Sequence, residues 1–232
     1  MNANQTNAGL IVAAGASARM GFDKMTASLH GMPVVEWSLR AFQECSEITL
    51  GVLVCAPDRI AEFQKLAASY PKFQHIVAGG PERSASVLNG LRVLARSGAD
   101  YVAVHDAARP LVTPILISRI LEGARIHQAA AAAQPVTDTL HRGDGQGVLL
   151  ETVSRQGIYA MQTPQGARFK ILLAALEAHQ AGSTDEVSAL LAHGIRPVAI
   201  LNDKPNFKIT YPRDLAMAEA LMAKGAPLSN QI

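Results

Sequence analysis

The sequence lacks most features of the specialised protein classes. Charged residues make up only 17% of it, the formal net charge is +2, and no long run of Lys and Arg occurs, so we expect no nucleic-acid partner. No apolar stretch approaches the ~18 residues of a membrane span. Residues 1–8 are polar and lack the charged-then-apolar plan of a signal peptide. These absences predict a cytoplasmic protein that does not associate with a membrane.

Cysteine is scarce as well. The two cysteines, Cys45 and Cys55, lack the C-x-x-C spacing of redox and metal sites, which favours buried thiols with a structural role. Apolar residues, in contrast, make up 49% of the 232 residues, which is ample for the core of one α/β domain of ordinary size. With no internal repeat in the sequence, we expect a single domain over residues 1–232.

The most informative stretch is residues 10–24, LIVAAGASARMGFDK. Its short apolar run, closed by Gly15, is typical of a buried strand with a sharp exit. Small residues fill positions 15–18, and Arg19 and Lys24 follow. Small residues let backbone N–H groups approach an anion closely, and the two cations would neutralise it. The stretch matches neither G-x-x-x-x-G-K-[ST] nor G-x-G-x-x-G, so the pattern alone fits a phosphate site and an ordinary strand-to-helix turn equally well.

Apolar runs alternate with amphipathic segments along most of the chain. Strands are predicted over residues 10–13, 48–55, 75–78, 101–104, 158–161 and 197–201, and helices over 33–42, 59–68, 83–96, 116–124, 169–176 and 215–221. Uniformly apolar strands that alternate with helices predict an α/β protein with a Rossmann-like, mostly parallel sheet covered by helices on both faces. In such sheets ligands bind beyond the carboxyl ends of the strands, so Gly15 and Asp106 are expected to face one cleft.

The alternation breaks at about residues 137–156. Three closely spaced glycines and few apolar residues in this segment predict a protruding β-hairpin arm that lies outside the main sheet. Just before it, the alanine run at 129–133 fits a strand or a helix end. Further on, Thr184 precedes two acidic residues and is predicted to cap a helix.

Seven short motifs follow one another in an order that is itself informative. They are the segment at 10–24, GGPERSASV at 79–87, HDAARP at 105–110, DT at 138–139, TPQ at 163–165, TDE at 184–186 and NFKIT at 206–210. In order and spacing they resemble the sugar-phosphate nucleotidyltransferases, and among these most of all the 2-C-methyl-D-erythritol 4-phosphate cytidylyltransferase family. Two positions depart from the family's pattern. Ser17 stands where a second glycine is usual, and Asp23 stands where a proline usually precedes the lysine.

The resemblance implies a single nucleotidyltransferase domain that joins CTP to a sugar-alcohol phosphate and releases pyrophosphate, in non-mevalonate isoprenoid biosynthesis. It implies a cytoplasmic homodimer whose arm embraces the second subunit, so that Arg155 reaches the partner's substrate phosphate. It also implies Mg²⁺, mainly on the triphosphate, with Asp106 as the candidate ligand nearby.

The resemblance further assigns roles to individual residues. Arg19 and Lys24 are the implied catalytic residues, acting on the triphosphate and the transition state. The implied nucleotide-binding residues are Ala13, Ala14, Gly15, Gly80, Ser86, Asp106 and Ala107. The implied acceptor-binding residues are Asp106, Arg109, Thr139, Arg155 and Lys208.

Several alternatives stay open at this point. A ribitol-5-phosphate cytidylyltransferase shares most of the motifs and the CTP chemistry. A nucleotide-dependent Rossmann oxidoreductase would need glycine at Ser17 and Met20, and a non-catalytic nucleotide sensor would not need Lys24.

Single residues also have alternative roles. Ser86 fits a local helix cap, Asp106 fits a turn that closes a strand, and Arg155 fits a surface charge on an arm folded back onto its own domain. We interpret His105 as structural, because a phosphate nucleophile needs no general base. Asp23 is placed to pair with Lys24 in the empty enzyme.

Overall fold

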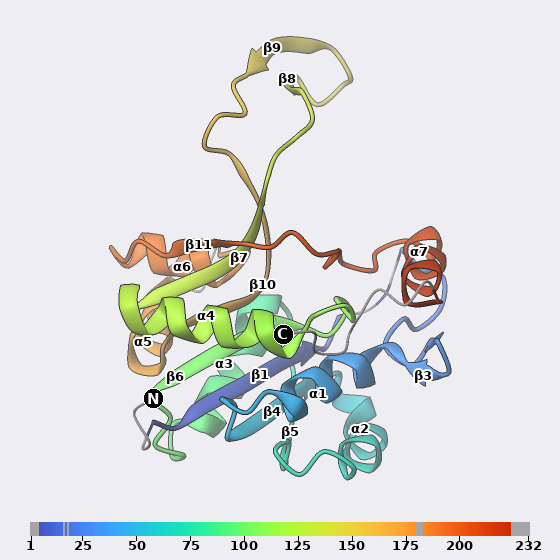
Figure 1. Ribbon diagram of the computed structural model, residues 1–232, viewed down its shortest axis with the longest axis vertical. Coiled ribbons are helices and arrows are strands. Elements are labelled where there is room, and N and C mark those ends of the chain that lie inside the picture. Colours follow the sequence, from blue (N-terminus) through green and yellow to red (C-terminus); the bar gives the residue numbers. More distant parts are fainter. Residues whose placement is uncertain (1–4, 16, 18, 180–182, 224–232) are drawn as a thin grey trace.

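The computed structural model describes residues 5–15, 17, 19–179 and 183–223. Its centre is a seven-stranded sheet in the order β11-β7-β10-β6-β1-β4-β5 (Figure 1). The strands are β1 (Asn7–Ala13), β4 (Leu50–Cys55), β5 (His75–Ala78), β6 (Tyr101–Asp106), β7 (Ala129–Pro135), β10 (Tyr159–Arg168) and β11 (Val198–Leu201). Strand β10 runs antiparallel to both of its neighbours, and the other pairs are parallel. The predicted fold class is confirmed.

Helices cover both faces of this sheet. One face packs against α1 (Val34–Glu44), α2 (Ile60–Ala67) and α4 (Pro114–His127), and the other against α3 (Arg83–Leu94), α5 (Phe169–His179) and α6 (Glu186–Ala192). Successive strand residues alternate between the two cores. In β1, for example, Leu10 joins the α3 side and Ile11 the α1 side. Because both faces are covered, the parallel strands are mostly apolar, which is why they can be recognised in the sequence.

The strand order reverses direction at β1. From β1 the chain proceeds to β4 and β5 on one side, whereas β6 lies on the other side of β1, with Asp106 opposite Val12. The connections that leave β1 and β6 therefore diverge, and such a switch point leaves a crevice at the carboxyl ends of the strands.

Residues 137–156 form the predicted arm. Strands β8 (Leu140–Gly143) and β9 (Leu149–Val153) pair antiparallel in a sheet of their own, and the hairpin projects away from the main sheet (Figure 1). Three consecutive apolar side chains on it, Val148, Leu149 and Leu150, are exposed in the single chain.

Two local predictions were wrong. Strand β10 does not end at residue 161 but continues to Arg168, across a register shift between Met161 and Gln165. Pro164 lies at this irregularity, where a residue without an N–H group is tolerated within a strand. The cap of α6 is Asp185 rather than Thr184, because the Asp185 carboxylate accepts the Ser188 N–H.

Other local features were ambiguous or unforeseen. The alanine run forms strand β7. Its small side chains allow α4 to pack closely, since a Cβ at Gly123 of this helix would lie 2.8 Å from the Cβ of Ala130. The short strands β2 (Ser28–Leu29) and β3 (Met32–Pro33) and the 3₁₀ turn η1 (Pro57–Arg59) are too short to show a period in the sequence. A last helix, α7 (Pro212–Ala223), closes the described chain.

Two predictions from composition can be compared with the structure. Cys45 and Cys55 are buried free thiols, as predicted, and burial raises the pKa of Cys55 to about 11. Among the described residues, none of the helices has the length and apolarity that crossing a bilayer requires.

Candidate active site

A cleft of about 250 Å³ opens beyond the carboxyl ends of β1, β5 and β6. The predicted residues that line it are Ala14, Gly15, Lys24, Gly80, Ser86, Asp106 and Lys208. The Gly15 loop and the Asp106 segment therefore face one cleft, as expected from the fold. Arg83 and Glu82, for which the motifs implied no role, also line it.

Lys24 is buried at the base of the loop that follows β1. Its Nζ donates to the Ile209 carbonyl at 3.1 Å, and its backbone N–H donates to Ser17 Oγ at 3.3 Å. Burial lowers the pKa of Lys24, and the nearby cations Lys208 and Arg19 lower it further. An ammonium has three N–H donors, so the carbonyl contact fixes the direction of Lys24 without using up its capacity to bind phosphate oxygens.

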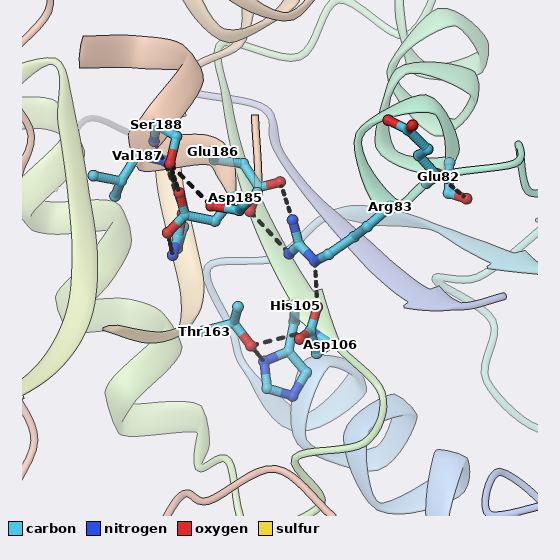
Figure 2. Close-up of polar contacts among 12 residues, drawn as sticks. Glu82, Arg83, His105, Asp106, Thr163, Asp185, Glu186, Val187 and Ser188 are labelled. Atoms are coloured by element: carbon cyan, nitrogen blue, oxygen red, sulfur yellow. Dashed lines mark hydrogen bonds and ion pairs between the residues drawn. The ribbon is translucent and has the colours of Figure 1, made fainter. Parts of the chain in front are cut away.

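Asp106 is the anionic centre of the cleft. Its Oδ1 accepts from Arg83 Nε at 2.8 Å (Figure 2), and its Oδ2 accepts from Lys208 Nζ at 2.7 Å. Burial alone would raise the pKa of this carboxyl, but Arg83 and Lys208 together hold it well below its usual range. Asp106 thus carries a negative charge in a part of the protein that has little solvent.

His105 lies beneath Asp106 and is fully buried. Its Nε2 is 3.1 Å from the Arg109 carbonyl, which only accepts, so its Nδ1 accepts from the Thr163 hydroxyl at 3.0 Å (Figure 2). The same hydroxyl oxygen accepts the Asp106 N–H at 3.0 Å. Burial lowers the pKa of His105 to about 3. An imidazole that is neutral and forms hydrogen bonds through both ring nitrogens has a structural role, in agreement with the interpretation from the sequence.

Two of the residues implied to bind the nucleotide have side chains that point into the core. Ala13 and Ala107 are buried on the α1 side of the sheet and do not line the cleft. Both main-chain groups of Ala107 are bonded, the N–H to the Val12 carbonyl and the carbonyl to Ser38 Oγ. Strand alternation explains the direction of the Ala13 side chain, because the side chain before Ala14 points away from the cleft face. Nucleotide binding by Ala13 and Ala107 stays a prediction.

Four further predicted residues lie outside the cleft. The Arg109 guanidinium donates to the carbonyls of Asn206 and Met161, at 2.8 and 3.4 Å. Thr139 and Arg155 are on the arm, where Arg155 donates to the Thr137 carbonyl. Arg19 is exposed, with its guanidinium carbon 5.6 Å from the centre of the Tyr211 ring. Ala16 and Ala18, part of the predicted phosphate loop, lie outside the described residues.

Ser86 contacts the turn before α3, but it is not the cap of this helix, because the N-cap residue is Glu82. Its hydroxyl accepts the Gly80 N–H at 3.0 Å and donates to the Glu82 carbonyl at 3.0 Å, which is a local bond between the start of α3 and the preceding turn. Ser86 and Gly80 also line the cleft. The hydroxyl therefore shapes the turn that a ligand would meet.

Asp23 does not pair with Lys24, contrary to the expectation. Its carboxylate forms an ion pair with Arg59 and accepts from the Met25 N–H at 3.1 Å and from Thr26 Oγ1 at 2.7 Å. Burial acts to raise the pKa of Asp23, but these donors and the charge of Arg59 lower it. Ser17 Oγ lies 3.5 Å from Asp23 Oδ1, so the two positions that depart from the family's pattern contact each other.

The donor set of the cleft suits a hard cation that keeps its own water. Within the described ranges, no cluster of three or more His, Cys, Asp or Glu side chains could form a protein-only metal site. Mg²⁺ typically uses one or two carboxylates together with water and substrate phosphates. Asp106 meets that need, since each carboxylate oxygen has a second lone pair beyond its bond to Arg83 or Lys208.

Comparison with known proteins places the chain in a well-populated group. Residues 8–224 match the family described as IspD, 2-C-methyl-D-erythritol 4-phosphate cytidylyltransferase. A protein of that description from Cereibacter sphaeroides is 40% identical over 225 residues, which cover 96% of this chain and 100% of the relative. A crystal structure of a 4-diphosphocytidyl-2C-methyl-D-erythritol synthase has a TM-score of 0.82 at 32% identity, covering 94% of this chain and 99% of that one. For the Francisella tularensis 2-C-methyl-D-erythritol 4-phosphate cytidylyltransferase the TM-score is 0.80 at 28% identity, covering 93% and 99%.

The contacts of Asp23 predict how the loop responds to substitution. We expect Asp23→Ala to lower the free energy of unfolding by about 1–2 kcal/mol, because it leaves the Met25 and Thr26 donors without their acceptor. Asp23→Asn should cost less, since asparagine can accept the same bonds. Urea unfolding measures both values, and Asp58→Ala, an exposed acid on η1, is the control. Equal stability of Asp23→Ala and the control would contradict the inferred role.

Proposed function

The chain belongs to the 2-C-methyl-D-erythritol 4-phosphate cytidylyltransferase family, and from this premise we propose that its cleft binds CTP and methylerythritol phosphate and joins them with release of pyrophosphate. The observation that carries the proposal is the convergence of Lys24, Asp106 and Lys208 on one cleft at the switch point of the sheet. These residues come from motifs far apart in the sequence.

The reaction explains why cations dominate the cleft. An oxygen of the acceptor phosphate attacks the α-phosphorus of CTP, a new P–O bond forms, and the bond to the β-phosphate oxygen breaks so that pyrophosphate leaves. The nucleophile is already an anion and needs no base. Two highly charged anions must approach each other, so positioning and charge neutralisation supply most of the rate enhancement.

Lys24 and Arg19 are proposed to act on the triphosphate. Lys24 is held by the Ile209 carbonyl, so its ammonium is preorganised where negative charge develops as pyrophosphate leaves. Arg19 presents an exposed planar fork that suits phosphate oxygens. The turn at Gly80 and Ser86, together with Ala14 and Gly15, is proposed to hold the nucleotide.

Asp106 and Lys208 are proposed to face the acceptor, and Asp106 also to provide one carboxylate ligand for Mg²⁺. When bound, Mg²⁺ would neutralise triphosphate charge. The proposal is supported by the exposed position of Lys208, whose side chain is 38% accessible while its Nζ is bonded to Asp106. The acceptor phosphate can therefore reach Lys208 from solvent.

The arm is proposed to complete the site of a second subunit in a two-fold dimer. A two-stranded hairpin is marginal by itself, and the exposed Val148, Leu149 and Leu150 favour burial against a partner. Thr139 and Arg155 would then contact the partner's acceptor. Residues 1–232 would form one nucleotidyltransferase domain with this arm, and the cytoplasmic location stays a prediction from the sequence.

The choice of acceptor decides the proposed function. We expect pyrophosphate release with CTP, Mg²⁺ and 2-C-methyl-D-erythritol 4-phosphate. With ribitol 5-phosphate we expect a kcat/KM at least 100-fold lower, because hydroxyl groups that are buried in the site without a hydrogen-bond partner cost free energy. A coupled pyrophosphate assay across both acceptors measures this ratio. A preference for ribitol 5-phosphate, or no turnover with either, would contradict the proposal.

The role of Lys24 predicts a loss of turnover. We expect Lys24→Ala to lower kcat by roughly 10²–10³, because it removes a fixed charge from the transition state. Since Lys24 is buried, thermal unfolding must show that the variant is folded, and Lys65→Ala, on an exposed position of α2, is the control. Near-normal turnover of a folded Lys24→Ala variant would remove Lys24 from the catalytic set.

Subunit exchange tests whether the site is shared. We expect dimers of Arg19→Ala and dimers of Arg155→Ala to be nearly inactive when pure. A mixed dimer has one site with both arginines, so random exchange should restore roughly a quarter of wild-type activity. If exchange is verified by mass spectrometry and no activity returns, Arg155 does not serve the partner's site.

A further inference from the structure

Arg83 joins two parts of the structure that lie far apart in the sequence. Its Nε donates to Asp106 Oδ1 at 2.8 Å, and its terminal nitrogens donate to the two carboxylate oxygens of Glu186 at 2.7 and 3.0 Å (Figure 2). A guanidinium that binds a carboxylate through two parallel bonds is fixed in both position and orientation. Glu186 therefore holds Arg83, and Arg83 holds Asp106.

Glu186 is buried so deeply that its role needs an explanation. Its side chain is 1% exposed, and an ionised carboxylate in such a place is costly unless a cation pairs with it. Burial raises the pKa of Glu186, and Arg83 opposes that shift. A hydrophobic residue would fill this position at lower cost, so the buried acid is better explained by what it does to Arg83.

The helix that carries Glu186 is clamped to the sheet. The side chain of Gln165, on β10, donates to the Asp185 carboxylate at 2.9 Å and accepts the Val187 N–H at 3.0 Å. Gln165 lies opposite Val104 on β6, the strand that ends at Asp106. Glu186 and Asp106 are thus anchored to neighbouring strands, which keeps the distance that Arg83 spans constant.

The two cations bound to Asp106 differ in their freedom to move. The Arg83 side chain is 22% exposed and makes three described bonds to carboxylates. The Lys208 side chain is 38% exposed, and its described bond goes to Asp106. An incoming phosphate can draw Lys208 from Asp106 at the cost of one bond, whereas moving Arg83 would leave Glu186 buried without a partner.

We propose that Arg83 is a positioning residue for Asp106, and that Glu186 keeps Arg83 in place so that Lys208 is the cation that moves to the acceptor phosphate. The inference rests on the proposed function, in which Asp106 and Lys208 face the acceptor. In this scheme neither Arg83 nor Glu186 touches the reacting atoms. The motifs at 79–87, 163–165 and 184–186 then share one task, which is to hold the Asp106 carboxylate fixed while Lys208 is released.

Steady-state kinetics with CTP and methylerythritol phosphate form the first test. We expect Arg83→Gln and Glu186→Gln each to lower kcat/KM for the acceptor by roughly 10–100-fold, because Asp106 and Lys208 lose their fixed geometry, and to change KM for CTP much less. Glu177→Gln is the matched control. It makes the same carboxylate-to-amide change at an exposed position of α5, so its kinetics should stay close to those of the wild type.

A double variant separates positioning from stability. Arg83→Gln/Glu186→Gln removes both buried charges, so it should melt at a higher temperature than either single variant, each of which leaves one buried charge without its partner. Its turnover should nevertheless stay as low as that of Arg83→Gln. Recovery of turnover together with stability would overturn the proposal. A loss confined to KM for CTP would assign Arg83 to nucleotide binding and would overturn it as well.

A titration without substrate gives an independent test. The charged or titratable groups that act on Asp106 are Arg83, Lys208, Lys24, His105, Arg109 and Glu186. We expect ¹³C NMR of the Asp106 carboxyl, assigned with Asp106→Asn, to show a higher pKa in Arg83→Gln than in the wild type and in Glu177→Gln, because a cation that favours the carboxylate has been removed. An unchanged pKa overturns the positioning role. Lack of turnover by the wild type would instead count against the proposed function, and the titration would still decide the inference.

Discussion

The buried charge of Asp106 is the constraint on which the rest of the site depends. A carboxylate on a side chain that is 10% exposed can stay ionised only with compensating charges and hydrogen bonds. This chain brings them from four directions. Arg83 and Lys208 bind the carboxylate oxygens, Thr163 fixes the backbone, and neutral His105 supports Thr163 from below. Each of these groups belongs to a motif whose residue types would be unremarkable by themselves. Their common partner explains why they occur together.

The fold makes this convergence possible. Parallel strands bring their carboxyl ends to one edge, and the reversal of strand order at β1 opens a crevice there. The antiparallel strand β10 adds Thr163 and Gln165 to the same edge from the opposite direction. The loop that carries Lys208 is then anchored between the sheet and the cleft, because Asn206 donates to the Thr163 carbonyl and the Ile209 N–H to the Ala108 carbonyl.

The sequence predicted the elements whose pattern is local and missed the contacts between residues that lie far apart in the chain. The parallel strands and the arm were predicted, because continuous apolar runs and closely spaced glycines can be recognised within a few residues. The cleft residues next to strand ends, such as Gly15 and Asp106, followed from the same reasoning. The buried direction of the Ala107 side chain was not predicted, since a motif does not say which of its side chains face the cleft. The link between Arg83 and Glu186 spans 103 positions, and no local period indicates which buried acid an arginine will meet. Asp23 was predicted to pair with its sequence neighbour Lys24, but its partner is Arg59, on η1.

The two departures from the family's pattern show how such a site can change without losing its geometry. A proline before the lysine restricts the backbone directly, whereas Asp23 restricts it through bonds to Met25, Thr26 and Arg59. Ser17, in the left-handed region at φ 53°, takes a conformation that glycine adopts without cost, and its hydroxyl bonds the Lys24 N–H and lies near Asp23. A serine that alone would strain the loop thus contacts the residue that stabilises it. Hydrogen bonds of side chains here fix the loop conformation that glycine and proline fix in the family's pattern through backbone freedom and restriction. Lys24 keeps its direction toward the cleft because the Ile209 carbonyl, on a separate segment, accepts a bond from its ammonium.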